Sequence, residues 1–496
     1  MFYKFFLSDV CFNKACYKDC KFKNLQSAAD IRIGDLWGKK YAENEEGITG
    51  VLTLTEKGEN VLKECNVEII PESTDCCDRR ATQEQNQATL LLWISVDIIE
   101  KQSEAKNNLQ NSPDTPYRTY YWIQITFKMK TVGIVTMHCV VNHGSALQTW
   151  ATQETIRRLG YDARIINYRY PNASHPKHRN RLKLVPQFFL HLLQGFPQQR
   201  KKRLYEKFWK ENFRLTKPYP SKESIMSEPP LFDVYVAGSD QIWNPQHTNG
   251  DGTYFLDFVP EGRKKISYAS SFSRSTLEPA YERNVARWLN SFSAISVREE
   301  NGVKIIDRFL PGKAVVTLDP TLLLTQSDYQ PLIDKSTYKT TEPYILVYCL
   351  KYMYNPYPYA THFIEEASRQ TGLKVICVDF TALQRIHAKS VYNFRDGLGP
   401  SEFLWLFANA SMVITTSFHG TAFALNFGKS VYSIVKDKDF GDDRMKSILN
   451  LCGVPERVIP MGTQGVRFST NMDNAKVQNN LDGMRSISIN FLKNNL

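Results

Sequence analysis

Ser417-Phe418-His419-Gly420-Thr421 follows the apolar run 412–416 and opens a predicted helix. Backbone amides at a helix start bind anions. A histidine there can bind a phosphate when charged, or transfer a proton near neutral pH. The segment predicts a site for an anionic donor, with His419 as the catalytic group and Ser417, Phe418, Gly420 and Thr421 around the donor. The alternative is a histidine that only caps the turn.

Two further segments end apolar runs with a cation or a carboxylate. Arg298 follows Ala294-Ile295-Ser296-Val297, and its planar guanidinium is suited to a carboxylate or phosphate. The alternative is a surface pair with Glu299 or a contact with the following helix. Asp240 follows the run 233–237 and could accept a proton, whereas the alternative is that it caps a turn.

Polar groups beside an aromatic ring suit sugar hydroxyls and a sugar face. Gly238-Ser239-Asp240-Gln241-Ile242-Trp243-Asn244 has this composition, and Asn142-His143-Gly144 forms a similar loop after an earlier apolar run. The residues expected to contact an acceptor are Asn142, His143, Gly144, Gln241, Trp243 and Asn244. The alternative for both loops is a purely structural role.

These segments all follow strands in an alternation of strands and helices. Buried strands are expected at 132–135, 163–166, 233–237, 265–269, 294–298, 344–348, 374–378 and 412–415, with helices between them. Such alternation predicts an α/β fold with parallel sheets, whose ligands bind outside the carboxyl ends of the strands. Two similar α/β halves with a cleft between them would resemble a GT-B arrangement.

The 496 residues suggest several domains. We predict a small cysteine-containing α+β module at 1–75, a polar linker at 76–128, a Rossmann-like half at 129–330 and a second at 331–496. The hydrophobic share of 42% and the charged share of 23% are those of an ordinary globular protein. No stretch reaches the roughly 18 apolar residues that span a bilayer, and the first residues do not form a secretory signal. A cytoplasmic location is expected.

The net charge of +11 is concentrated in one segment. Residues 177–217, within a predicted insertion at 175–218, hold twelve Lys or Arg and two Glu. This localisation argues against a nucleic-acid-binding protein. The segment is interpreted either as a solvated helical hairpin or as a contact with an anionic membrane surface, where lipid-linked sugars are assembled.

The order of several segments resembles the polysaccharide pyruvyl transferase family. The matching segments are Val132-Gly133-Ile134-Val135, Asn142-His143-Gly144-Ser145-Ala146-Leu147-Gln148, Gly238-Ser239-Asp240-Gln241-Ile242-Trp243-Asn244-Pro245, Tyr254-Phe255-Leu256-Asp257-Phe258, Ser267-Tyr268-Ala269-Ser270-Ser271-Phe272, Val297-Arg298-Glu299, Leu318-Asp319-Pro320-Thr321 and Ser417-Phe418-His419-Gly420. The resemblance spans residues 129–480.

This resemblance implies a GT-B-like fold, phosphoenolpyruvate as donor and a hydroxyl pair of a glycan or lipid-linked sugar as acceptor. It implies no cofactor, because phosphoenolpyruvate is a substrate. The resemblance implies that His419 binds the phosphate or transfers the proton. It implies that Arg298 binds the carboxylate or phosphate of the donor and that Asp240 contacts the acceptor. Many relatives carry arginine where this chain has Ser417, and His143 replaces an aromatic residue.

The N-terminal segment resembles another family, the C-terminal part of the coenzyme F420 hydrogenase/dehydrogenase beta subunit. The matching residues are Cys16, Cys20-Lys21-Phe22-Lys23, Asp30-Ile31-Arg32-Ile33-Gly34-Asp35-Leu36-Trp37-Gly38 and Thr55-Glu56-Lys57-Gly58-Glu59. Cysteines hold iron–sulfur clusters in that family. Cys11, Cys16 and Cys20 fall short of the four thiolates that a cluster usually takes, so a structural or interaction module is favoured over a cluster or metal site.

Three other functions are compatible with the sequence. A nucleotide-sugar-dependent glycosyltransferase could use the same two halves, although no acidic residue for the ribose is evident after the donor helix. A redox protein could act through the cysteines of the N-terminal segment. A catalytically inert scaffold is the third alternative, which Ser417 favours slightly.

Overall fold

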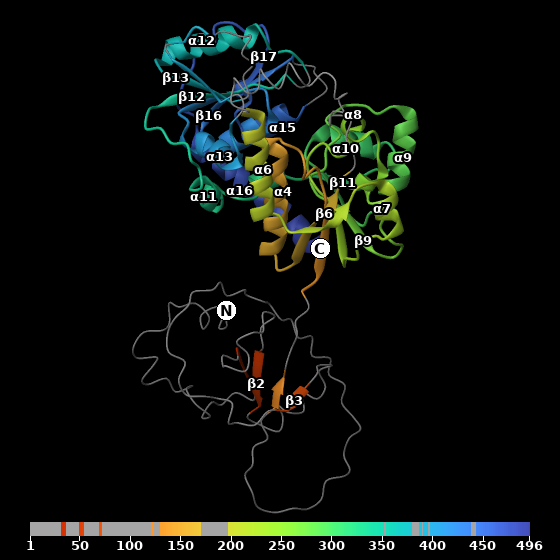
Figure 1. Ribbon diagram of the computed structural model, residues 1–496. Coiled ribbons are helices and arrows are strands. Elements are labelled where there is room, and N and C mark those ends of the chain that lie inside the picture. Colours follow the sequence, from red (N-terminus) through yellow and green to blue (C-terminus); the bar gives the residue numbers. More distant parts are fainter. Residues whose placement is uncertain are drawn as a thin grey trace, which may run out of the picture. The chain divides into compact units, whose positions relative to one another are not determined.

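In the computed structural model, the chain forms two compact units, Met1–Lys128 and Met129–Leu496 (Figure 1). Four short strands of the first unit are described. In the second unit the structure describes residues 129–169, 197–351, 354–378, 386–388, 390–394, 397–437 and 443–496. No helix of these described parts is long and apolar enough to cross a bilayer.

The described strands of the first unit form two antiparallel pairs. β1 (Ile31–Asp35) pairs with β2 (Thr49–Thr53), and β3 (Ile69–Pro71) pairs with β4 (Tyr121–Ile123). β1 lies within the segment 30–38 that resembles the beta subunit, and β4 lies in the segment predicted as a linker. The cysteines considered as cluster ligands lie outside the described residues.

The first half of the second unit is built on a five-stranded parallel sheet. Its strands stand in the order β7 (Leu215–Tyr219), β6 (Asp162–Tyr168), β5 (Thr131–Val135), β8 (Val234–Ala237) and β9 (Lys264–Ser267). β10 (Ile295–Val297) and β11 (Ala314–Val316) form a parallel pair, which a bridge between Ile266 and Ala294 joins to β9. Ile134 and Val236 on the central strands are completely buried, as expected for a parallel sheet covered on both faces.

Helices cover this sheet and lead into its loops. They are α4 (His143–Arg158), α6 (Pro197–Asn212), α7 (Lys222–Ser227), α8 (Pro245–Thr248), α9 (Pro279–Leu289) and α10 (Glu300–Asp307), with the 3-10 turns η5 (Gly252–Phe255) and η6 (Pro320–Leu322). Asn142 and Asn244 cap α4 and α8 with their side chains, which fixes where the loops after β5 and β8 end.

The second half carries a six-stranded parallel sheet. Its order is β14 (Val391–Phe394), β13 (Lys374–Val378), β12 (Tyr344–Tyr348), β15 (Met412–Thr415), β16 (Ser430–Val435) and β17 (Val458–Pro460). Its helices are α11 (Gln326–Ile333), α12 (Tyr359–Thr371), α13 (Pro400–Asn409), α14 (Phe418–Asn426), α15 (Arg444–Leu451) and α16 (Asn474–Asn495), with the 3-10 turn η7 (Pro455–Arg457). The two sheets confirm the predicted α/β fold with two Rossmann-like halves in a GT-B-like arrangement.

The described end of the basic segment belongs to the first sheet. Residues 197–212 form α6 and residues 215–219 form the edge strand β7, so this part completes a strand–helix–strand unit after β6. Tyr205 and Phe208 of α6 are buried in the core. The expected solvated hairpin is therefore wrong for residues 197–217, because their apolar side chains pack inward. Residues 170–196 lie outside the described part.

Strand order changes direction once in each sheet. The chain enters the first sheet at β5, adds β6 and β7 on one side and then β8 and β9 on the other. It enters the second sheet at β12 and returns to add β15 beside it. Ligands of open α/β sheets bind outside the carboxyl ends of the strands at such reversals, so the loops after β5, β8, β12 and β15 are the expected ligand loops.

The two halves share one hydrophobic core, and the last helix ties them together. Ile134 of the first sheet and Leu346 of the second belong to the same buried cluster. On α16, Ser488 Oγ accepts a hydrogen bond from the amide of Leu318 at 3.0 Å, and Arg485 Nε donates to the carbonyl of Leu322 at 2.7 Å. The loop between β11 and α11 is thus held at two points by α16.

Candidate active site

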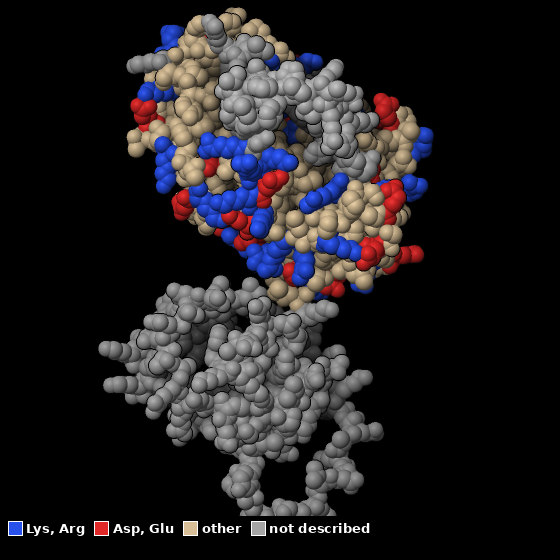
Figure 2. All heavy atoms as spheres, in the orientation of Figure 1, with Lys and Arg blue, Asp and Glu red and all other residues tan. Residues whose placement is uncertain are grey.

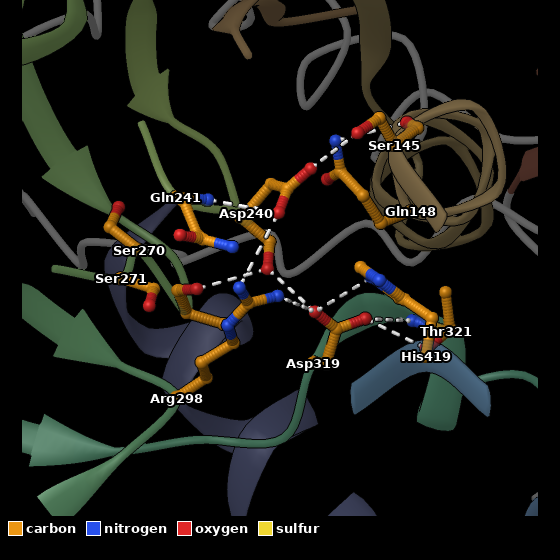
Figure 3. A network of polar contacts seen from close by, with 12 residues as sticks. Ser145, Gln148, Asp240, Gln241, Ser270, Ser271, Arg298, Asp319, Thr321 and His419 are labelled. Atoms are coloured by element: carbon orange, nitrogen blue, oxygen red, sulfur yellow. Dashed lines mark hydrogen bonds and ion pairs between the residues drawn. The ribbon is translucent and has the colours of Figure 1, made fainter. Parts of the chain in front are cut away.

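Side chains from both halves meet beyond the carboxyl ends of their strands (Figure 3). Asp240 follows β8, Arg298 follows β10 and Asp319 follows β11, whereas His419 stands in the first turn of α14 after β15. The three residues predicted as catalytic therefore lie in one network, joined by Asp319.

Arg298 holds two carboxylates of this network. Its Nη1 donates to Asp319 Oδ2 at 2.9 Å, and its Nη2 lies 3.4 Å from Asp240 Oδ1. The guanidinium also lies over the ring of Phe418, 4.7 Å from its centroid. The side chain is completely buried, so Arg298 is committed to partners within the protein.

Asp319 is the most highly connected carboxylate. Oδ2 accepts from Ser239 Oγ at 2.9 Å, and Oδ1 accepts from the amide and the hydroxyl of Thr321 at 3.0 and 2.7 Å. Burial alone would raise the pKa of Asp319, but His419, Arg298 and Thr321 together outweigh it and hold the pKa below its usual value. The carboxylate is therefore ionised at neutral pH.

Asp240 has an unusual backbone conformation. Its φ is +76°, in the left-handed region, where a non-glycine residue costs about 1–3 kcal/mol. Oδ2 accepts from Ser145 Oγ at 2.6 Å and Oδ1 from the amide of Gln241 at 2.9 Å. Burial alone would raise the pKa of Asp240, but Arg298, His419 and these hydrogen bonds lower it to about 2. The result is an ionised, firmly oriented carboxylate.

His419 stands between the two carboxylates and α4. Its Nε2 lies 3.8 Å from Asp319 Oδ2 and has no hydrogen-bond partner among the described residues. A Cβ atom at position 144 would come within 2.1 Å of its Nδ1, so the ring needs glycine at Gly144. Burial lowers the pKa of His419, and Asp319 and Asp240 oppose this only in part. The ring is therefore mainly uncharged at neutral pH when no ligand is bound.

Glu299 is part of the interior. Its Oε1 accepts hydrogen bonds from Ser271 Oγ and from the amides of Phe272 and Ser273 at 2.8, 3.1 and 3.2 Å. Oε2 lies 3.8 Å from Arg298 Nε, and both side chains are completely buried. Burial raises the pKa of Glu299 to about 7, against the pull of Arg298. The alternative of a surface pair is therefore wrong, and Glu299 holds the loop after β9.

The residues predicted around the donor shape the start of α14. Ser417 Oγ accepts from the amide of Gly420 at 3.4 Å, and Thr421 Oγ1 lies 2.7 Å from Ser433 Oγ. A Cβ at Gly420 would come within 2.3 Å of Thr415 Oγ1. The glycine thus allows the helix to pack closely on β15, and these contacts fix the position of His419.

The residues predicted around the acceptor separate into two groups. Asn142 accepts from the amide of Ser145 at 3.1 Å. Asn244, completely buried, donates to Gln241 Oε1 at 3.1 Å. Asn142, Gly144 and Gln241 lie next to residues that contact Asp240 or His419, so they border the site.

His143 and Trp243 belong to the hydrophobic interior. The ring of His143 stacks on Phe403, 4.4 Å between centroids, and its Nδ1 shares a hydrogen bond of 2.7 Å with Tyr205 Oη. Trp243 is completely buried and donates from Nε1 to the carbonyl of Tyr254 at 3.1 Å. Neither ring presents a face to a sugar.

Among the residues that the structure describes, no group of three or more His, Cys, Asp or Glu side chains is arranged so that it could hold a metal ion. The carboxylates of Asp240, Asp319 and Glu299 are bound by hydroxyls, amides and Arg298. This donor set suits buried structural and catalytic carboxylates.

Several residues of the site, among them Asp319, Ser145 and Arg444, were not predicted from the sequence as site residues. Asp319 and Ser145 lie within quoted segments, but each has the local pattern of a cap or a helix start. Arg444, at the start of α15, has its guanidinium 5.8 Å from the centroid of the Phe418 ring. Its sequence surroundings carry no signal that separates it from any other helical arginine.

The chain is similar to known proteins in both sequence and fold. The family model described as polysaccharide pyruvyl transferase matches residues 142–437, which contain Asp240, Arg298, Asp319 and His419. No curated protein matches the chain. UDP-GlcNAc 2-epimerase from Methanocaldococcus jannaschii in complex with UDP-GlcNAc and UDP is 14% identical, with 72% of this chain and 92% of that chain covered and a TM-score of 0.42.

Two further solved structures are similar at the same level. UDP-GlcNAc 2-epimerase from Neisseria meningitidis bound to UDP-GlcNAc is 10% identical, covering 72% of this chain and 91% of that chain with a TM-score of 0.38. Arabidopsis thaliana UGT89C1 complexed with quercetin is 11% identical, covering 74% and 94% with a TM-score of 0.36. None of these structural similarities assigns an activity to the chain.

Proposed function

Because the chain belongs to the polysaccharide pyruvyl transferase family, we propose that it transfers pyruvate from phosphoenolpyruvate to a hydroxyl pair of a sugar in a polysaccharide precursor, forming a ketal. The observation that carries the proposal is the network of His419, Asp319, Arg298 and Asp240 beyond the strand ends of both halves. Phosphoenolpyruvate supplies the transferred group, so no cofactor is needed.

The reaction requires one proton donor and stabilisation of moving charge. A proton adds to the methylene carbon of the enolpyruvate and leaves an oxocarbenium-like centre at the neighbouring carbon. One sugar hydroxyl bonds to that carbon and loses its proton. Phosphate then leaves, and the second hydroxyl closes the ring and loses its proton, so the products are the ketal and inorganic phosphate. Groups fixed where charge develops accelerate such a reaction.

His419 is proposed as the acid. Its pKa is lowered in the empty site by burial, but a phosphate beside it would raise the pKa, because an anion favours the charged ring. Donor binding would thus charge the acid that the next step uses. Asp319, 3.8 Å from Nε2, would stabilise the imidazolium.

Asp240 is proposed to orient the acceptor. A carboxylate with a pKa of about 2 is a weak base, so its main contribution would be to accept a hydrogen bond from a sugar hydroxyl. Arg298, whose guanidinium is bound to Asp240 and Asp319, is proposed to act through them as a positioning residue.

Calorimetric titration of phosphoenolpyruvate, with UDP-GlcNAc as the comparison ligand, tests the donor. Binding of phosphoenolpyruvate and not of the nucleotide sugar is expected. Selective binding of UDP-GlcNAc would overturn the proposal and favour a glycosyltransferase. Absence of binding to both ligands would also overturn the proposal and would direct attention to the N-terminal unit.

A finer proposal concerns the membrane, at whose inner, cytoplasmic face lipid-linked acceptors are assembled. Arg203, Lys207 and Lys210 are exposed on α6, whereas Tyr205 and Phe208 are buried. Figure 2 shows Lys and Arg side chains gathered over α6. We propose that this face contacts anionic lipid, since basic residues near such a surface contribute about 1 kcal/mol each.

Sedimentation with phosphatidylserine-containing vesicles tests this contact. Replacing Arg203, Lys207 and Lys210 together with glutamine is expected to weaken vesicle binding about 100-fold, which corresponds to roughly 3 kcal/mol. The matched control replaces Arg283, Arg287 and Lys313, which are also exposed. Equal loss in both variants would show that only net charge matters and would contradict a contact through α6.

A further inference from the structure

The network of Asp240, Arg298 and Asp319 carries a net negative charge. Both carboxylates have lowered pKa values and are ionised at neutral pH, and Arg298 offsets only one of them. His419 adds little charge, because its pKa is lowered as well. Figure 3 shows Arg298 directed between the two carboxylates. A donor that carries both a phosphate and a carboxylate would be repelled unless a further cation faces it.

Arg444 lies close enough to supply that cation. Its guanidinium is 5.8 Å from the centroid of Phe418, the ring on which Arg298 lies at 4.7 Å. The ring of His419 packs edge-on against the same phenyl group, with centroids 5.3 Å apart. Two guanidiniums and an imidazole therefore contact the ring of Phe418.

The electrostatic effects of Arg444 agree with this position. Its charge contributes to the lowered pKa values of His419 and His247, after the larger effect of burial, and it opposes the raised pKa of Glu299. The charge of Arg444 therefore acts on His419 and Glu299 of the network and on His247. Arg444 is 94% buried and lies outside the residues 142–437 that match the family model.

We propose that Arg444 binds the phosphate of the donor, an inference that rests on the proposed function. The planar guanidinium can donate two parallel hydrogen bonds to phosphate oxygens. The phosphate carries the larger share of the donor's charge and so gains most from a cation beside the aspartates. Arg444 would then hold the phosphate, while His419, which packs against the same ring, moves the proton.

Titration of phosphoenolpyruvate, inorganic phosphate and pyruvate into the full chain tests this assignment. Arg444→Gln is expected to weaken phosphoenolpyruvate and inorganic phosphate binding by about 10- to 100-fold, the usual loss for a hydrogen bond to a charged group. Pyruvate, which lacks phosphate, should bind equally to both forms. Arg444→Lys keeps the charge without the fork and should recover part of the loss.

Arg457→Gln is the matched control. Arg457 also lies on an aromatic ring of the second half, 4.6 Å from the centroid of Tyr432, and donates to the carbonyl of Asn471. Its replacement should leave all three affinities unchanged. Equal phosphoenolpyruvate binding by wild type and Arg444→Gln would overturn the role of Arg444 and leave the proposed function standing.

Two other outcomes are also decisive. A wild-type protein that binds no phosphoenolpyruvate would overturn the proposed function and this inference with it. An Arg444→Gln variant that loses pyruvate but keeps inorganic phosphate would overturn the assignment to the phosphate. Circular dichroism spectra that match between the Gln and Lys variants would show that the comparison is made on folded protein.

Discussion

His419→Gln is expected to lower kcat by about 10²- to 10⁴-fold, the range for loss of a positioned general acid. Glutamine retains a polar side chain but cannot deliver a proton, and the ring's place between Gly144 and Asp319 would be filled only in part. Phosphate release from phosphoenolpyruvate in the presence of glycan acceptors measures the effect. Donor affinity should fall much less than kcat.

The control for this experiment is His362→Gln. His362 lies on α12 with a side chain that is 75% exposed, so its loss should leave kcat unchanged. If His419→Gln retained more than about a tenth of the wild-type kcat, proton transfer would have to come from another group, because general acid catalysis is worth at least about 10²-fold.

Arg298→Met is expected to destabilise the second unit by about 3–5 kcal/mol, the cost of removing one partner from a buried ionic network. Methionine fills a similar volume, but it leaves the carboxylates of Asp240 and Asp319 buried beside each other without their cation. Urea unfolding followed by tryptophan fluorescence measures the loss.

The effect of Arg298→Met should depend on pH with a defined sign. The folded-state pKa of Asp240 is lowered to about 2 from its ordinary value of 3.8. Its stabilising contribution is therefore complete above about pH 4 and disappears as the pH falls toward 2. The difference between wild type and variant should shrink over that interval.

Arg308→Met provides a matched surface comparison. Arg308 pairs with Glu282 at 3.2 Å, and its side chain is 52% exposed. Exposed pairs contribute roughly 0–1 kcal/mol, so this variant should be nearly as stable as wild type. A loss of similar size in both variants would mean that the network around Arg298 has no special role in stability.

The sequence predicted the sheets well because buried parallel strands are continuous apolar runs. The runs 344–348 and 374–378 coincide with β12 and β13 residue for residue. Burial on both faces of such a strand can be recognised from its own sequence, and the glycines and polar residues after it mark the loop. The sequence does not determine the order of the strands in each sheet. The structure shows that order, and it brings Asp240 close to His419.

The individual contacts of the site could not be predicted, because they join residues far apart in the chain. The Asp-Pro-Thr pattern at Asp319 indicates a local cap, and it does cap η6. The same carboxylate also binds Ser239 and Arg298, 80 and 21 positions away. Trp243 shows the reverse error: polar neighbours suggested an exposed ring, whereas a hydrogen bond to Tyr254 allows it to be buried.

The contacts of α16 with the loop after β11 have a consequence for folding during synthesis. The amide of Leu318 and the carbonyl of Leu322, which flank Asp319, find their partners in Ser488 and Arg485. Chains begin to fold from the N-terminus as they are synthesised. The two backbone groups therefore lack these hydrogen-bond partners until α16 leaves the ribosome. The backbone on either side of Asp319 is therefore expected to acquire its final hydrogen bonds only after α16 has emerged from the ribosome.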